Sequence, residues 1–396
     1  MLAWGRLGID REIGLACGLT VVACAFAYGG LFSHSYPGDT SVYQGYGSAL
    51  VQHGRIPYHD FYDEYPPGSV PVFALPALIW NAHYLILFKL WMTACAVGFT
   101  ACAGWVCRRL GLGLVRLVPV VLAPVALGPV FLNRYDPLAA LLVSVALVTA
   151  LRARDRTTGA LLGIGTAVKL YPVVLLPIFA RRAGSLGRAG AAYLLAGAVL
   201  VLPFFAIAPG GVGYSLWTQL RRHLQIESLG ASILLAGSKL GIHHVNWIRG
   251  KPGSIDLGGG TANVVAGVSS FGSLALVGLV AYAYWRAADS DERLVTACAA
   301  AVAAFTIFGK VLSPQYLTWL VPLVPLAAGR RGLWAAGTLL VALALSMPEY
   351  LFWGRHGLEQ QNWTVWLLLL RNGLLVAAFW LLYSQLRQGE RIAKAS

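Results

Sequence analysis

The sequence predicts an all-α membrane protein, a polytopic bundle of about twelve transmembrane helices. Of the 396 residues, 58% are hydrophobic and only 12% are charged, whereas a soluble domain carries about 25% charged residues. Apolar runs long enough to cross a bilayer recur along the whole chain, and the run at residues 138–151 lacks the two-residue alternation of a lipid-facing β-barrel. Because backbone groups in lipid must bond internally, these runs should form helices.

Short basic loops predict the topology. Most of the 30 basic residues fall in clusters at residues 6–11, 108–116, 152–156, 181–188, 286–293, 330–331 and 387–394. The positive-inside rule assigns these clusters, and with them both chain termini, to the cytoplasm. The same rule accounts for the net charge of +14, so we predict no nucleic-acid partner.

The predicted elements follow from this alternation. The first span is residues 13–32, and an external loop at residues 33–82 should contain a short helix at 40–53 and an interfacial helix at 70–80. Further spans are predicted at residues 83–107, 117–131, 138–151, 159–180, 189–207, 263–285, 294–308, 316–327, 333–347 and 364–386. Basic loops flank residues 159–180, so this stretch must cross twice, and Pro172 should break it. With a second long external segment at residues 209–262, the chain forms one membrane domain, residues 1–396.

Cysteine and histidine patterns predict neither a disulfide framework nor a metal site. The six cysteines all lie in or at the ends of apolar runs. A metal site built from His59, Asp60, Asp63 and Glu64 is conceivable, but these residues follow no specific ligand spacing. We expect no metal and no cofactor.

Asp39 is the residue that we single out for catalysis. It follows the first helix in the segment Tyr36-Pro37-Gly38-Asp39-Thr40 and precedes the short helix at residues 40–53. Aspartate is a preferred helix N-cap, which is one interpretation. The other is a carboxylate near the membrane surface that takes a proton from an acceptor hydroxyl. The sequence leaves both open.

Other polar residues gather on the same external face. Lys169 and Lys310 lie at the ends of apolar helices on this face. Ionisable groups at such positions are costly and usually functional. The alternative is that their long side chains only extend to the membrane interface. Residues 58–68 combine four aromatic residues with three carboxylates, a pattern that fits a sugar-binding surface or an interfacial aromatic belt. Cations cluster again around Arg221, Arg222 and His223. They could bind an anionic acceptor, a donor phosphate or anionic lipid headgroups.

Five short motifs occur in order along the chain. They are Asp39 after the first helix, Tyr65-Pro66-Pro67-Gly68, Arg134-Tyr135-Asp136, Lys169-Leu170-Tyr171-Pro172, and Lys310-Val311-Leu312-Ser313-Pro314-Gln315-Tyr316. Together they resemble the GT-C superfamily of integral membrane glycosyltransferases. Within it the chain most resembles the bacterial polyprenyl-phosphate-mannose-dependent α-mannosyltransferases, over residues 1–386.

The resemblance implies a hexosyltransferase of the plasma (inner) membrane. The enzyme would move a sugar, mannose in the first instance, from a polyprenyl-phosphate donor to a lipid-linked or glycan acceptor on the extracytoplasmic face, with inversion. Asp39 would be the general base. Donor and phosphate binding would fall to Lys169, Lys310, Arg134, Tyr171 and Gln315, and other substrate contacts to Asp136, Tyr62, Tyr135, Glu64 and His223. Membrane lipids, the lipid-linked donor and the acceptor are then the partners.

Other functions fit parts of the pattern. A transporter or flippase of lipid-linked sugars would also have many helices and buried charges, but transporters usually have repeated halves and midplane sites. A non-catalytic cell-envelope scaffold is a third reading if Asp39 only caps a helix. Among enzymes, arabinose or another pentose could replace mannose.

Overall fold

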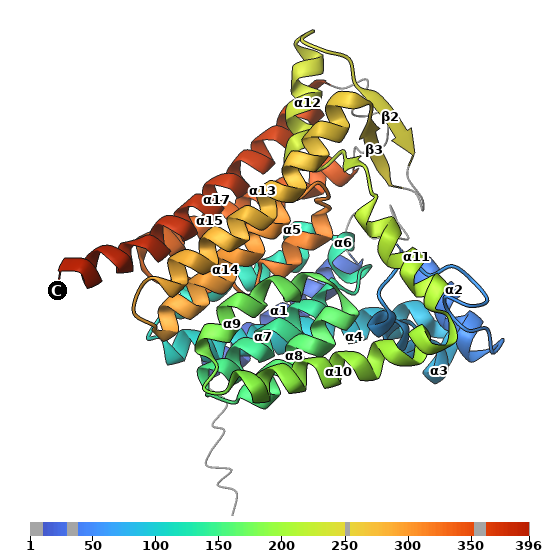
Figure 1. Cartoon of the computed structure of the whole chain (residues 1–396), viewed down its shortest axis with the longest axis horizontal. Coiled ribbons are helices and arrows are strands. Elements are labelled where there is room, and N and C mark those ends of the chain that lie inside the picture. Colours follow the sequence, from blue (N-terminus) through green and yellow to red (C-terminus); the bar gives the residue numbers. More distant parts are fainter. Residues whose placement is uncertain (1–10, 30–38, 250–253, 352–361, 396) are drawn as a thin grey trace, which may run out of the picture.

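The computed structural model describes residues 11–29, 39–249, 254–351 and 362–395. The predicted end of the first span at residue 32, residues 33–38 of the first external loop, and Lys251 lie outside these ranges. Within them the protein is a bundle of helices with one small sheet (Figure 1). The all-α fold class is therefore confirmed in its main feature, while the sheet was not predicted.

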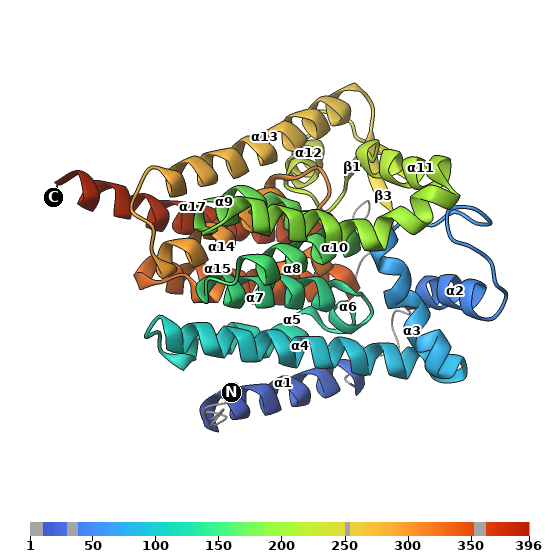
Figure 2. The same ribbon diagram turned by 60° about the horizontal axis from the view of Figure 1, so that its bottom comes forward.

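The bundle consists of helices that run roughly side by side (Figure 2). They are α1 (Arg11–Gly29), α4 (Tyr84–Arg109), α5 (Val118–Leu127), α7 (Asp136–Leu151), α8 (Asp155–Val168), α9 (Leu176–Arg182), α10 (Leu186–Ile207), α13 (Gly260–Trp285), α14 (Asp291–Phe308), α15 (Gly329–Leu351) and α17 (Asn362–Ala395).

Shorter elements gather at one end of this bundle (Figure 2). They are α2 (Thr40–Val51), η1 (Pro67–Ser69), α3 (Val70–Trp80), η2 (Asn81–His83), α11 (Pro209–Leu220), α12 (Leu229–Lys239) and the strands β1 (Leu224–Gln225), β2 (Asn246–Arg249) and β3 (Ile255–Gly258). The sheet order is β1-β3-β2 and all pairs are antiparallel, with Leu257 opposite both Leu224 and Trp247. Strands this short carry too little alternation to be predicted.

Several predicted boundaries are confirmed. The helices expected at residues 40–53 and 70–80 are α2 and α3. The break at Pro172 is also present, because α8 ends at Val168 and is followed by η4 (Tyr171–Leu175) and α9. A proline ring clashes with the carbonyl group four residues earlier, and for Pro172 that residue is Val168.

Two predicted spans are wrong as continuous helices. Residues 316–327 form the 3-10 turns η5 (Pro314–Trp319) and η6 (Val324–Leu326), where prolines remove backbone donors. Residues 117–131 form part of η3 (Leu114–Leu117), then α5 and α6 (Pro129–Leu132), with a break at Gly128, whose φ is +56°.

Five helical stretches among the described residues are long and apolar enough to cross a membrane. They are Arg11–Gly29, Pro67–Arg109, Leu186–Ile207, Gly260–Trp285 and Asn362–Gln388. These stretches indicate a membrane protein. The total of twelve spans stays a prediction.

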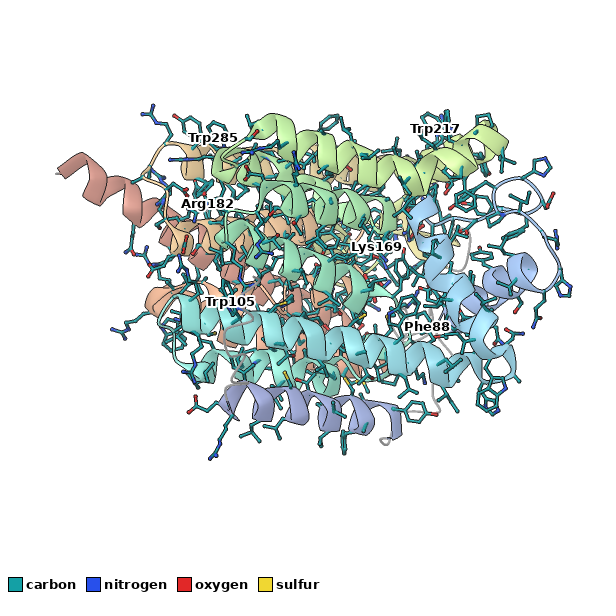
Figure 3. All side chains as sticks on the ribbon, turned by 90° about the horizontal axis from the view of Figure 1, so that it is seen from below. Phe88, Trp105, Lys169, Arg182, Trp217 and Trp285 are labelled. Carbon is teal, nitrogen blue, oxygen red and sulfur yellow. The ribbon has the colours of Figure 1, made fainter. Side chains whose placement is uncertain are left out.

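Ion pairs join the helix ends at one end of the bundle. At one end Arg109 and Arg182 pair with Asp291 and Asp289, at 3.0 and 2.7 Å. Figure 3 shows Trp105, Arg182 and Trp285 at this end and Trp217 at the other. Exposed tryptophans at both ends, with apolar helices between them, are typical of a bilayer-spanning protein.

The core is centred on α14, where every residue from Leu294 to Ala304 is buried. Most of these residues are alanine, which lets neighbouring helices approach closely. Glycine does the same between α8 and α10. A Cβ on Gly159 would lie 2.0 Å from the carbonyl oxygen of Ala189. Helix α8, which leads to Lys169, is thereby held tightly against its neighbour.

Candidate active site

A cavity of about 810 Å³ lies at the end of the bundle that carries α2, α11 and the sheet. Side chains from both long loops and from the ends of several bundle helices line it. Most of the residues that the sequence singled out are among them: Asp39, Glu64, Arg134, Tyr135, Lys169, Tyr171, Lys310 and Gln315.

Asp39 occupies the N-cap position of α2, but its side chain makes no capping hydrogen bond. Instead, its Oδ2 accepts a hydrogen bond of 3.0 Å from the hydroxyl of Tyr65 and forms an ion pair with Nη1 of Arg134. Its Oδ1 makes no hydrogen bond to any residue that the structure describes. The side chain is 27% exposed and lines the cavity. The geometry therefore favours the carboxylate interpretation over the cap.

The chain brings Asp39 and Arg134 together through the turn that precedes α7. Asp136 and Pro137 begin α7, and proline fits a first helical turn because its missing N–H would have no partner there. The hydroxyl of Thr40 donates to the carbonyl oxygen of Asn133 at 3.1 Å. This bond ties the start of α2 to the turn that holds Arg134 and Tyr135.

Lys169 lies in extended backbone directly after α8, with φ −150° and ψ 127°. Its ammonium group is 3.3 Å from Oδ1 of Asp136 and 4.1 Å from the centre of the Tyr135 ring. Asp136 is 1% exposed and also accepts a 2.7 Å hydrogen bond from the indole of Trp319. Asp136 therefore lies behind the cavity wall, where it holds Lys169 and Trp319. It has no hydrogen bond or ion pair with Arg134 among the described residues and does not line the cavity, so its role as a substrate contact stays a prediction.

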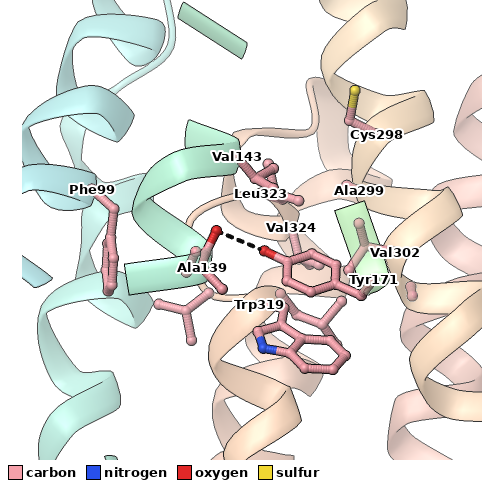
Figure 4. Packing of buried hydrophobic residues seen from close by; sticks show 14 of the residues in the cluster. Phe99, Ala139, Val143, Tyr171, Cys298, Ala299, Val302, Trp319, Leu323 and Val324 are labelled. Carbon is pink, nitrogen blue, oxygen red and sulfur yellow. Dashed lines mark hydrogen bonds between the residues drawn. The ribbon is translucent and has the colours of Figure 1, made fainter. Parts of the chain in front are cut away.

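Three stacked aromatic rings form the wall next to Lys169. The rings of Tyr171 and Trp319 are 4.1 Å apart and 6° from parallel, and Tyr316 stacks on Trp319 at 4.4 Å. Figure 4 shows Tyr171 over Trp319, with its hydroxyl donating to the carbonyl oxygen of Ala139 at 3.1 Å. Tyr171 thus lines the cavity with its ring, while its hydroxyl is already bonded.

Two cations lie on another wall, formed by the ends of α11 and α14. Lys310 donates to the carbonyl oxygen of Leu220 at 2.6 Å, and no ion pair is found for it among the described residues. Burial, and then the nearby Arg222, lower the pKa of Lys310. Burial opposes the charge of Arg222, but Tyr316, Asp256 and Glu64 outweigh it and raise its pKa.

Backbone hydrogen bonds join the Lys310 segment to β1. The amide of Gln225 donates to the carbonyl oxygen of Lys310 at 3.0 Å, and the amide of Leu312 donates to the Gln225 side chain at 2.9 Å. Behind them, Arg371 of α17 is completely buried and donates to the carbonyl oxygen of Glu227 at 2.7 Å. Arg371 therefore holds the segment that directly follows β1, the strand to which Lys310 is bonded.

Buried polar atoms in the cavity lining lack partners. Among the described residues, the Tyr135 hydroxyl, Nε of Arg134 and the Thr306 hydroxyl have no hydrogen bond. Buried polar groups are rarely left unpaired, so such atoms indicate where a polar ligand would bind. A carboxylate, several cations, aromatic rings and unpaired donors in one cavity fit a phosphorylated sugar substrate.

Besides Asp136, two predicted residues lie outside the cavity. The hydroxyl of Tyr62 is 3.0 Å from that of Thr218, and its ring packs edgewise on Tyr214. His223 is exposed. Neither lines the cavity, although the neighbouring Arg222 does.

The model of glycosyltransferase family 87 matches residues 64–314, more than half of the chain. The chain belongs to glycosyltransferase family 87. A search of curated proteins found no match. The range matched by family 87 contains Arg134, Lys169 and Lys310, whereas Asp39 precedes it and Gln315 follows it.

Sequence reasoning missed several residues in and behind this cavity. Tyr65 and Tyr316 lie within the motifs already noted, and Arg222 lies in the cationic cluster of the second loop. Arg371 had the clearest available signal, a charge inside a predicted span. Of the residues described, no group of three or more His, Cys, Asp and Glu side chains is arranged to hold a metal ion.

Proposed function

We propose that this family 87 protein is a GT-C-type membrane enzyme that transfers a hexose, mannose in the first instance, from a polyprenyl-phosphate donor to a lipid-linked or glycan acceptor, with inversion. Family membership supports glycosyl transfer. The observation that carries the proposal is the Asp39 carboxylate, which lines a cationic, aromatic cavity and caps no helix.

Asp39 is the general base in this proposal. Tyr65 and Arg134 hold Oδ2, which leaves Oδ1 to accept the proton of the acceptor hydroxyl. The acceptor oxygen forms a bond to the anomeric carbon as the bond from that carbon to the phosphate oxygen breaks. The electron pair of the broken bond stays on the phosphate, and the proton stays on Asp39.

Lys310 and Arg222 steady the leaving phosphate. Inversion requires the base and the leaving group on opposite faces of the anomeric carbon, and these cations follow α11 and α14, whereas Asp39 precedes α2. Lys169 is 4.1 Å from the Tyr135 ring and 5.6 Å from that of Tyr316. Cations aimed at developing phosphate charge are a strong source of transition-state stabilisation.

The apolar part of the cavity suits a prenyl chain. Val311 directly follows Lys310, and Leu274 of α13 and Phe305 of α14 also line the cavity. A lipid whose phosphate contacts Lys310 would thus have apolar side chains beside its first isoprene units. This arrangement supports a lipid-linked donor over a soluble nucleotide sugar.

The charge asymmetry of the bundle supports an extracytoplasmic site. The basic loops lie at the end opposite to the cavity, and the positive-inside rule assigns such loops to the cytoplasm. The proposal therefore includes twelve crossings of the plasma membrane, with both termini in the cytoplasm. The cavity lies at one end of the bundle rather than halfway along its helices, which favours an enzyme over a transporter.

The test compares wild type with Asp39→Asn in nanodiscs, using polyprenyl-phosphate mannose and arabinose as donors and a panel of lipid acceptors. We expect wild type to transfer mannose and Asp39→Asn to lose roughly 10²–10⁴-fold in kcat, the usual range for a lost general base. The melting temperature should fall only by the contribution of the ion pair with Arg134, because no cap is lost.

Asp60→Asn is the matched control, since Asp60 is an exposed carboxylate in the same loop and does not line the cavity. The kcat of Asp60→Asn should equal that of wild type. Normal turnover by Asp39→Asn would remove the base assignment. Movement of labelled donor across the bilayer without transfer would favour a transporter.

A further inference from the structure

Three of the cations that line the cavity, Lys169, Lys310 and Arg134, differ in what holds them. Lys169 is paired with the buried Asp136, and Lys310 with a backbone carbonyl group. Arg134 alone is paired with Asp39, the residue proposed to take up a proton during the reaction. Its ion pair is therefore the one that the chemistry itself would alter.

Charge moves across the site during transfer. The donor phosphate is a diester with one negative charge, and the monoester that leaves carries up to two above about pH 6. Asp39 loses its negative charge when it takes the proton. One negative charge thus disappears beside Arg134 while another develops on the phosphate in the same cavity.

We propose that Arg134 changes partner during the reaction, from the Asp39 carboxylate to the leaving phosphate. This inference rests on the proposed function and identifies the residue that links the base to the leaving group. Protonation of Asp39 weakens the ion pair just as the monoester needs another cation. When Asp39 returns its proton to water and the monoester departs, Arg134 pairs with the carboxylate again.

The local structure allows this exchange. Only Nη1 of Arg134 is found bound to Asp39, and Nε is buried without a hydrogen-bond partner among the described residues. Guanidinium groups bind phosphate through two parallel N–H bonds, so Arg134 keeps unused donors for an oxyanion. Arg134 lies in the turn before α7 and lines the cavity with a side chain that is 13% exposed.

Lys169 cannot take this role. Its partner Asp136 is 1% exposed, lies behind the wall and also holds Trp319. Nothing in the reaction protonates Asp136, so the Lys169–Asp136 pair stays intact throughout. Lys169 therefore keeps its partner throughout the reaction, whereas Arg134 exchanges its partner when Asp39 is protonated.

Asp39→Asn imitates the protonated carboxyl group, so the binding of the leaving group tests the idea without turnover. We would measure the dissociation constant of farnesyl phosphate, a short monoester probe, by calorimetry at pH 7.5 in detergent. Asp39→Asn should bind the probe about tenfold more tightly than wild type, because one charged hydrogen-bond donor is released. In the Arg134→Gln background, the same Asp39→Asn change should produce only the smaller gain that removal of one negative charge from the cavity gives.

Glu64→Gln is the matched control, because Glu64 is another carboxylate that lines the cavity and has no ion pair with Arg134. It should tighten binding by charge removal alone, and this gain should survive in the Arg134→Gln background. If Arg134→Gln does not fold, Arg134→Lys replaces it, and the smaller reach and single ammonium of lysine should reduce the Asp39→Asn gain.

The outcomes separate the two proposals. An Asp39→Asn gain that is just as large without Arg134 would overturn the exchange of partners and leave the glycosyltransferase proposal standing. Absence of any gain in Asp39→Asn would overturn it too. If wild type and all folded variants fail to bind farnesyl phosphate, the proposed function itself is contradicted.

Discussion

The hydroxyl of Tyr65 donates a 3.0 Å hydrogen bond to Oδ2 of Asp39. The Tyr65 ring packs edgewise against Tyr43, Phe73 and Tyr135, with ring centres 5.3–5.6 Å apart. Since these neighbours hold the ring, the direction of its hydroxyl is set by packing. Tyr65 is therefore a positioning residue for the carboxylate.

Tyr65→Phe should lower kcat by roughly tenfold or more, because a hydrogen bond to a charged group is worth about 1.5–3 kcal/mol. The KM for the lipid donor should change little, since the ring packing is kept. The acid limb of the pH–rate profile should move to higher pH, because the lost bond favoured the charged carboxylate. Steady-state kinetics between pH 5 and 9 would measure both effects.

Tyr62→Phe is the control for that prediction. Tyr62 lies in the same loop, but its hydroxyl contacts Thr218 outside the cavity. Its kcat should match wild type. A larger loss in Tyr62→Phe than in Tyr65→Phe would restore the original assignment of Tyr62 to the substrate and contradict the role of Tyr65.

Local sequence signals predicted much of this site. Asp39, Lys169 and Lys310 were recognisable because a charge beside an apolar run has few structural explanations. The break that presents Lys169 was predictable from Pro172 alone. These features depend on residues close together in the chain, and all three residues line the cavity.

Features that depend on distant contacts were not predictable. Asp136 looked like a substrate residue, but its partner Trp319 is 183 positions away, and only the fold places it behind the wall. The sheet that carries Gln225 has strands of two to four residues, and the Lys310 segment is bound to it through backbone atoms. A backbone hydrogen bond leaves no signature in side-chain pattern.

Lys310 and Lys169 should respond differently to the same substitution. Lys310→Gln removes a cation with no carboxylate partner among the described residues, so the protein should keep its melting temperature and bind farnesyl phosphate roughly tenfold more weakly. Lys169→Gln leaves the buried Asp136 uncompensated, and breaking a buried pair costs about 3–5 kcal/mol. Its main effect should be a lower melting temperature.

Asp136→Asn tests the cause of that loss. In the double variant Lys169→Gln/Asp136→Asn no charge is left uncompensated, so much of the stability should return. Thermal unfolding of wild type, the two single variants and the double variant in one detergent gives the coupling energy between Lys169 and Asp136. Equal instability of Lys169→Gln and Lys310→Gln would contradict the different roles assigned to the two lysines.

Gly68 should tolerate no side chain. A Cβ at this position would lie 2.5 Å from the carbonyl carbon of Ala167 and 2.7 Å from the amide nitrogen of Val168. Because these backbone atoms directly precede Lys169, Gly68→Ala should shift the end of α8 and reduce both activity and thermal stability. Gly45→Ala, where nothing lies within 4 Å of the added carbon, should leave both intact or slightly improve stability.

Asp63 should make stability depend on pH. The side chain is completely buried, and Oδ2 has no hydrogen bond among the described residues. Burial raises the pKa of Asp63 from 3.8 to about 7, with Glu64 adding to the effect and the amide of Tyr65 opposing it. The folded state therefore binds this proton more tightly than the unfolded chain does. The resulting stability is complete below pH 3.8 and is lost as the pH rises through about 7.

Asp63→Asn, which stays neutral, should match wild type in melting temperature near pH 4 and exceed it increasingly from pH 5 to 8. The limiting difference is on the order of 4 kcal/mol, since each pKa unit corresponds to about 1.36 kcal/mol. Asp60→Asn provides the opposite case, because backbone and His59 hydrogen bonds lower the pKa of that exposed carboxyl group. A difference between Asp63→Asn and wild type that is constant across this pH range would show that Asp63 is charged throughout, and that the loop around it is more open to water than its buried position indicates.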